Sequence, residues 1–154
     1  MPGRCARLPR VSTEIPDAES VVGQFWPLHG PYSPERTAGA AATAAELVRY
    51  LNHATQSGPD GVPAAATAYR TVGGLQAAAG GLAQTLSQLD RHVQLWSEHA
   101  ALYDDTAGRD DQAAAAARAE AASAALDDAV LVARSLAHAL ARVHGELGHL
   151  GHPE

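Results

Sequence analysis

The sequence predicts an all-α protein, an antiparallel bundle of three or four helices with a long C-terminal helical hairpin and an irregular N-terminal tail. Apolar residues recur at alternating steps of three and four from Ala68 to Tyr103, and again from Ala119 to Leu150. A loop signal at residues 104–109 separates the two runs. With a hairpin centred there, Trp96 and Tyr103 fall opposite the alanines of residues 113–117, which permits the helices to approach closely.

Residues 1–32 are predicted to form the irregular tail, because five prolines interrupt any helical period. A GTG start codon at Val11 would place residues 1–10 outside the protein, and this start is a hypothesis. The tail contains arginines but no continuous apolar run, so it does not have the pattern of a signal peptide.

Residues 25–32 concentrate three of the seven aromatic residues of the chain in a proline-containing segment. Disordered tails are poor in aromatics, so these side chains are expected to bury against something. One interpretation is that the segment folds back and caps the groove of its own bundle. The other is a docking motif for a partner protein, whose predicted contact residues are Phe25, Trp26, Leu28 and Tyr32.

The helical bundle is predicted over residues 33–147, and its first helix has clear boundary signals. Ser33 is a suitable N-cap, Pro34 fits the first helical position, and Glu35 complements the helix dipole. The helix is expected to stop near Gln56, because residues 57–62 form a turn cluster.

Pro63 is predicted to open the next helix. Each glycine inside a helix costs about 1 kcal/mol relative to alanine, so a break is expected at Gly80-Gly81, with helices over 63–79 and 82–104. A single helix of about forty residues is the alternative, since the heptad phase passes through the glycines unchanged.

The last helix is predicted to begin after Asp110 or Asp111 as its N-cap and to fray among its C-terminal glycines, leaving residues 148–154 flexible. The large apolar residues of the three helical stripes form the predicted core: Leu47, Leu51, Leu75, Leu82, Leu86, Leu89, Val93, Trp96, Leu126, Leu136, Leu140 and Val143.

Charge and composition disfavour several classes of protein. A formal net charge of −6 gives little attraction to a phosphate backbone, so nucleic-acid binding is not expected. Cys5 is the single cysteine, so the chain cannot form an internal disulfide. No stretch approaches the roughly 18 apolar residues of a membrane span, and a cytoplasmic location is expected.

No catalytic, cofactor-binding or metal-ligating residue is predicted, and the protein is not expected to be an enzyme or to need a cofactor. Nucleophile-elbow, P-loop and dinucleotide-binding patterns are absent from the sequence. His138, His144 and His149 are spaced by six and five residues, which does not place two imidazoles on one metal ion. The aspartates of residues 104–111 are better explained as helix caps than as calcium ligands.

Residues 45–55, followed by the apolar run of residues 75–89, resemble small alanine-rich helical proteins of actinobacteria that carry no assigned function. The composition agrees with a GC-rich genome, since eleven basic residues include no lysine. The resemblance implies a lineage and a helical fold, and it implies no activity.

The function predicted from these observations is a non-enzymatic helical interaction protein, an adaptor or a homo-oligomer, whose partner is a protein. One alternative is a regulator that binds a small ligand or nucleic acid, either in a pocket between helices or through arginines gathered on one face: Arg49, Arg70, Arg91 and Arg134. A second alternative is a cryptic metal-binding protein, in which folding brings together His92, His99 or the terminal histidines.

Overall fold

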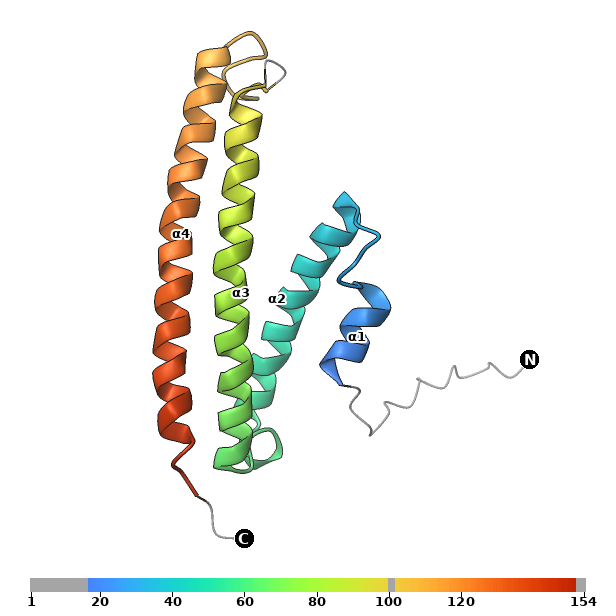
Figure 1. Cartoon of the computed structure of the whole chain (residues 1–154), viewed down its shortest axis with the longest axis vertical. Helices are drawn as coiled ribbons and strands as arrows, with labels where there is room; N and C mark the ends of the chain where they lie inside the picture. Colours follow the sequence, from blue (N-terminus) through green and yellow to red (C-terminus); the bar gives the residue numbers. More distant parts are fainter. Residues whose placement is uncertain (1–16, 100–101, 152–154) are drawn as a thin grey trace, which may run out of the picture. The chain divides into compact units, whose positions relative to one another are not determined.

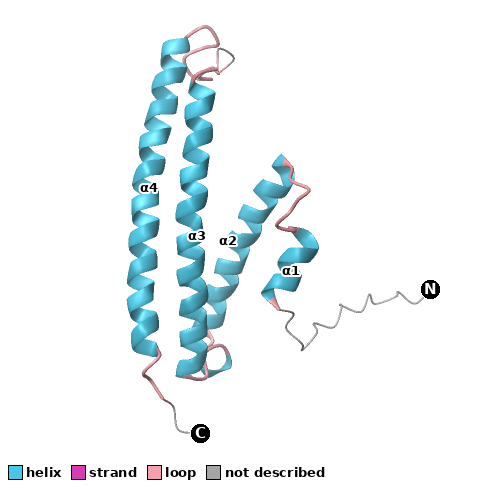
Figure 2. Cartoon of the chain, in the orientation of Figure 1, coloured by secondary structure: helices cyan, strands magenta, loops and turns pink. Residues whose placement is uncertain are grey.

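The computed structural model describes residues 17–99 and 102–151, and this part of the chain is all-α. Figures 1 and 2 show helices joined by loops, with no strand in the described residues. The elements in chain order are α1 (Ala18–Phe25), α2 (Pro34–Gln56), the short 3-10 helix η1 (Gly58–Asp60), α3 (Ala65–Ser97) and α4 (Gln112–Leu147).

The contacts divide the chain into two compact units, one ending at Ala54 and the other beginning at Thr55. The first contains α1 and most of α2, and the second contains the α3·α4 hairpin. The sequence predicted a helical bundle over residues 33–147, and the boundary between the two units falls inside this range. An amphipathic period identifies the apolar side of a helix but not the element that covers it, so this division was not visible in the sequence.

The prediction of an irregular tail is wrong at residues 18–25, which form α1. The Asp17 side chain caps this helix by accepting hydrogen bonds from the backbone N–H groups of Glu19, at 2.9 Å, and Ser20, at 3.3 Å. Pro27 follows the helix and does not interrupt it. Val11, the hypothetical start, and Cys5 lie outside the described residues.

The boundaries predicted for the first long helix are confirmed in α2. Pro34 is its first residue, and the Ser33 hydroxyl accepts a hydrogen bond from the backbone N–H of Arg36 at 3.2 Å. Hydrogen bonds from the backbone of Glu35 and from the Ser33 side chain lower the pKa of the Glu35 carboxyl. The helix ends at Gln56, immediately before the turn that contains η1.

The predicted break at Gly80-Gly81 is wrong, because α3 runs without interruption from Ala65 to Ser97. The alternative of a single helix is correct, although this helix starts two residues after Pro63 and ends before Glu98. The glycine penalty, about 1 kcal/mol per residue, is small beside the tertiary packing that stabilises most helices in proteins. Here that packing is the contact of α3 with α4.

The two long helices lie side by side and antiparallel, as Figure 1 shows. Their register agrees with the hairpin predicted from the sequence. Trp96 and Tyr103 line one pocket with Ala115, near the loop. At the far end the ring of Tyr69 stacks on that of His144, with centroids 3.9 Å apart.

The interior of the hairpin is made of small side chains, which differs from the predicted core. The buried apolar residues of the described chain are Ala79, Ala83, Ala115, Ala119, Val130 and Ala133. Methyl groups let the two backbones approach closely, and only the centre of each apolar stripe is then covered by the other helix.

None of the twelve predicted core residues is fully buried, and those of α3 and α4 flank the alanine seam. Half of them are exposed: Leu47, Leu82, Leu89, Trp96, Leu136 and Val143. The other half are partly buried: Leu51, Leu75, Leu86, Val93, Leu126 and Leu140.

Candidate functional site

One side of the α3·α4 hairpin is lined by large apolar residues. We call this surface the apolar face and define it by ten residues at helical steps of three, four and seven: Leu82, Leu86, Leu89, Val93 and Trp96 of α3, and Ala122, Ala129, Leu136, Leu140 and Val143 of α4. Leu82, Leu89 and Trp96 are 43 to 52 % exposed, and Leu136 and Val143 are 50 and 46 % exposed. The heptad pattern of the sequence therefore describes an uncovered surface of this hairpin.

A small apolar pocket of about 190 Å³ lies at the loop end of the apolar face. Val93, Trp96, Leu102 and Tyr103 form one side, and alanines of α4 form the other. The Arg109 guanidinium lies over the Tyr103 ring, 5.0 Å from its centroid, and holds that ring by a cation–π contact.

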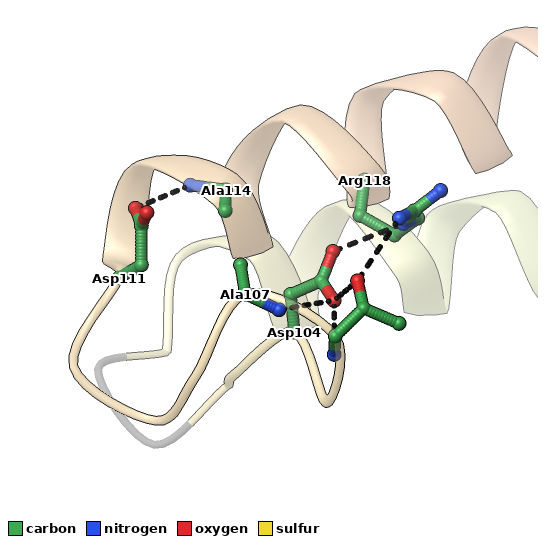
Figure 3. A network of polar contacts seen from close by, with 6 residues as sticks. Asp104, Ala107, Asp111, Ala114 and Arg118 are labelled. Carbon is green, nitrogen blue, oxygen red and sulfur yellow. Dashed lines mark hydrogen bonds and ion pairs between the residues drawn. The ribbon is translucent and has the colours of Figure 1, made fainter.

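The loop beside this pocket is organised around Asp104, as Figure 3 shows. The buried carboxylate of Asp104 accepts hydrogen bonds from the backbone N–H of Thr106 at 2.8 Å, from the Thr106 hydroxyl at 2.5 Å and from the backbone N–H of Ala107 at 3.3 Å. Nε of Arg118 forms an ion pair with its other oxygen at 3.1 Å. These donors, the Thr106 hydroxyl first, lower the pKa of Asp104 from 3.8 to about 2.

The predicted N-cap of α4 comes from Asp111. Asp111 accepts a hydrogen bond from the backbone N–H of Ala114 at 2.9 Å (Figure 3). Arg118, which lines the apolar pocket, is held by Asp104. Asp111 thus caps the start of α4, as the sequence predicted, whereas the role of Asp104 in the loop was not predicted.

The other side of the hairpin carries a polar groove of about 490 Å³. Small residues of both helices leave room in it, namely Gly80, Ala83 and Ala137. Its polar side chains come from both helices: Gln84, Ser87, Gln88 and Arg91 of α3, and Arg134 and His138 of α4.

A second groove of about 510 Å³ continues the same side of the hairpin toward the loop, because its residues follow those of the first groove at helical spacing. Glu120 and Asp127 line it. Close to this groove the buried Asp90 carboxylate accepts hydrogen bonds from the Ser123 hydroxyl and from Nε2 of Gln94, the latter at 2.7 Å.

The histidines of the described residues have separate surroundings. His144 stacks on Tyr69, His138 lines the polar groove, and His92 lies 6.0 Å from the Trp96 ring. Within residues 17–99 and 102–151, no three histidine, cysteine or acidic residues are grouped as a metal ion would require. His152 lies outside this part of the chain.

The aromatic segment of residues 25–32 folds against the first turn of α2. Nε1 of Trp26 donates a hydrogen bond to the carbonyl oxygen of Arg36 at 3.1 Å, and the Arg36 guanidinium donates to the carbonyl oxygen of Phe25 at 2.5 Å. The Tyr32 hydroxyl donates to the carbonyl oxygen of Leu28. Trp26 is partly buried, whereas the other three predicted contact residues are exposed: Phe25, Leu28 and Tyr32.

The polar groove was not predicted from the sequence, because its residues come from two helices. The sequence suggested Arg91 and Arg134 only as two of four arginines gathered on one face, and the hairpin places these two along one groove. The sequence does contain a signal for such a groove. Neither arginine has an acidic residue three or four positions away on its helix, so neither has an ion-pair partner at that spacing.

None of the helices in the described ranges has the length and hydropathy needed to cross a membrane. No family model, no curated protein and no solved structure matches this chain.

Proposed function

We propose that this protein is a non-enzymatic helical interaction protein that associates with a second copy of itself through the apolar face of the hairpin. The observation that carries the proposal is the exposure of Leu82, Leu89, Trp96, Leu136 and Val143 along that one surface. Contiguous apolar patches of this kind mark interaction sites on soluble proteins. The cytoplasmic location predicted from the sequence is part of the same proposal.

The exposed side chains offer a driving force for association. Full burial of a leucine or valine contributes about 1.5 to 3 kcal/mol, so each half-exposed side chain has about 1 kcal/mol still to gain. None of the ten residues that define the apolar face is charged. Two copies can therefore approach without burying an unpaired charge, which would oppose association.

The distribution of large and small residues suits a second copy. Toward the loop the large residues come from α3, including Leu89 and Trp96, while α4 supplies Ala122. Toward the far end α4 supplies Leu136 and Leu140, and the exposed Ala78 lies on α3. A two-fold axis parallel to the helices places α3 of one copy over α4 of the other, so large residues meet small ones and a four-helix arrangement results.

The test is sedimentation equilibrium of the full chain over a wide concentration range. The wild-type chain is expected to be a dimer, and Leu82→Glu with Leu136→Glu is expected to give a monomer of unchanged helix content by circular dichroism. A matched control is Leu95→Glu with Leu131→Glu, since these leucines are 58 and 60 % exposed and follow the spacing of the polar grooves. The control is expected to remain a dimer.

A wild-type chain that stays monomeric at every concentration would refute self-association, and so would equal dissociation of the two double variants. Thermal unfolding of the wild type gives a second readout that needs no variant. Dimer formation raises the melting temperature as the protein concentration rises. A melting temperature independent of concentration would contradict the proposal.

A further inference from the structure

We infer that the polar groove is a binding site for a small molecule that bears a phosphate group. The groove lies on the opposite side of the hairpin from the apolar face. At 3.6 residues per turn, the groove residues of α3, which are Gln84, Ser87 and Arg91, point about half a turn away from Leu82, Leu86 and Leu89. The inference therefore does not rest on self-association.

Two arginines, one from each helix, line this groove. Arg91 comes from α3 and Arg134 from α4, and both line the same volume of about 490 Å³. Side chains of a helix lean toward its N-terminus. Since the two helices are antiparallel, Arg91 leans away from the loop and Arg134 leans toward it, so the two side chains lean toward each other along the groove.

Neither arginine is neutralised by a carboxylate of the described residues. The ion pairs in that part of the chain are Arg118 with Asp104 and Arg49 with Glu46. Each free guanidinium presents five N–H donors in a planar fork, which matches the oxygens of a phosphate group.

The remaining side chains of the groove add donors and leave space. The amides of Gln84 and Gln88, the hydroxyl of Ser87 and the imidazole of His138 can each donate a hydrogen bond to an oxygen. Gly80, with Ala83 and Ala137, adds little bulk. A volume of about 490 Å³ lies in the range of small-molecule sites, about 300 to 1,000 Å³.

The adjoining groove limits the size of the anion. Glu120 and Asp127 line the continuation toward the loop, and an extended polyanion would meet their carboxylates there. The formal net charge of the chain is −6, which opposes a nucleic-acid backbone. A compact phosphate-bearing molecule meets fewer of these carboxylates than an extended polyanion does.

The experiment is isothermal titration calorimetry of the full chain with inorganic pyrophosphate at low ionic strength. Saturable binding of one pyrophosphate per chain is expected. Arg91→Gln and Arg134→Gln are each expected to weaken binding by about tenfold or more, because each removes a charge-assisted contact. Arg70→Gln, which makes the same change of charge on α3 outside the groove residues, is the matched control and is expected to leave binding unchanged.

Absence of binding by the wild type would overturn the inference. Equal losses in Arg70→Gln and the two groove variants would also overturn it, because binding would then follow net charge and not the groove. Single-stranded DNA is titrated in parallel. Binding of DNA without binding of pyrophosphate would contradict a small-molecule site. Sedimentation of the same variants separates failure of this inference from failure of self-association.

Discussion

Asp90 and Asp104 are the buried acidic residues of the described chain, and both depend on hydroxyl donors nearby in the fold. Asp90 lies in the alanine-rich seam and is bonded by Ser123 of the other helix and by Gln94. A buried carboxylate that loses its donors is strongly destabilising. Sliding α3 by one turn along α4 would separate Asp90 from Ser123, so this pair favours the observed register.

Asp104 gives the molecule a pH-dependent contribution to stability at the loop. Its pKa is about 2 in the folded chain against an ordinary value of 3.8, chiefly because Thr106 donates to the ionised carboxylate. A carboxyl group whose pKa is lower in the folded chain stabilises the fold fully at pH values above its unfolded pKa. This stabilisation is lost as the pH falls through its folded pKa. The stability difference between wild type and Asp104→Asn is therefore expected to be constant near neutral pH and to shrink between about pH 4 and pH 2.

Thermal unfolding of both proteins over this pH range measures the difference. Asp105→Asn serves as a control, because Asp105 is an exposed neighbour in the same loop. A difference between wild type and Asp104→Asn that does not change with pH would mean that the ionised form of Asp104 has no special stabilisation.

At the scale of the element, the glycine pairs inside α3 give the clearest local test. An added Cβ at Gly81 would meet nothing within 4 Å, and the residue is exposed in the middle of a continuous helix. Gly81→Ala is therefore expected to raise the free energy of unfolding by about 0.5 to 1 kcal/mol, because alanine loses less backbone entropy. Chemical denaturation monitored by circular dichroism measures it.

Gly73→Ala makes the same change where space is lacking. Its Cβ would lie 2.9 Å from Nε2 of His144, whose ring is stacked on Tyr69 and would have to move. The stabilisation seen at Gly81 is expected to be absent or reversed at this site, and to return when His144→Ala is added. Equal gains at both glycines would show that the His144 ring yields without cost.

Local sequence signals predicted helix ends better than helix continuity. Ser33 and Asp111 act within three residues of their own positions, and both caps are confirmed. The break expected in α3 rested on the local preference of glycine, which tertiary packing overrides. The helix α1 was missed because the prolines of the tail were interpreted as interruptions, and its capping residue Asp17 was not used as a signal.

At the scale of the whole molecule, the heptads and the loop together predicted the all-α class and the antiparallel register of α3 and α4. They did not predict which residues are buried. Periodicity places Leu82 and Leu136 near the alanines on their helices, but it does not show that the partner helix leaves both leucines half-exposed. The polar groove was missed for a related reason, because Arg91 and Arg134 line one surface only once α3 and α4 have paired.

The single connection between α3 and α4, which contains Asp104, also favours one order in which the hairpin folds. Residues near Trp96 and Ala115 are joined by a short stretch of chain, whereas Tyr69 and His144 are joined by a long one. Forming the distant contact first would cost about 1 kcal/mol more in loop-closure entropy. The hairpin should therefore close from the loop outward, and pulse-labelling hydrogen exchange during refolding is expected to protect amides near Val93 and Ala119 before those near Tyr69 and His144. Simultaneous protection at both ends would show that the hairpin collapses in one step.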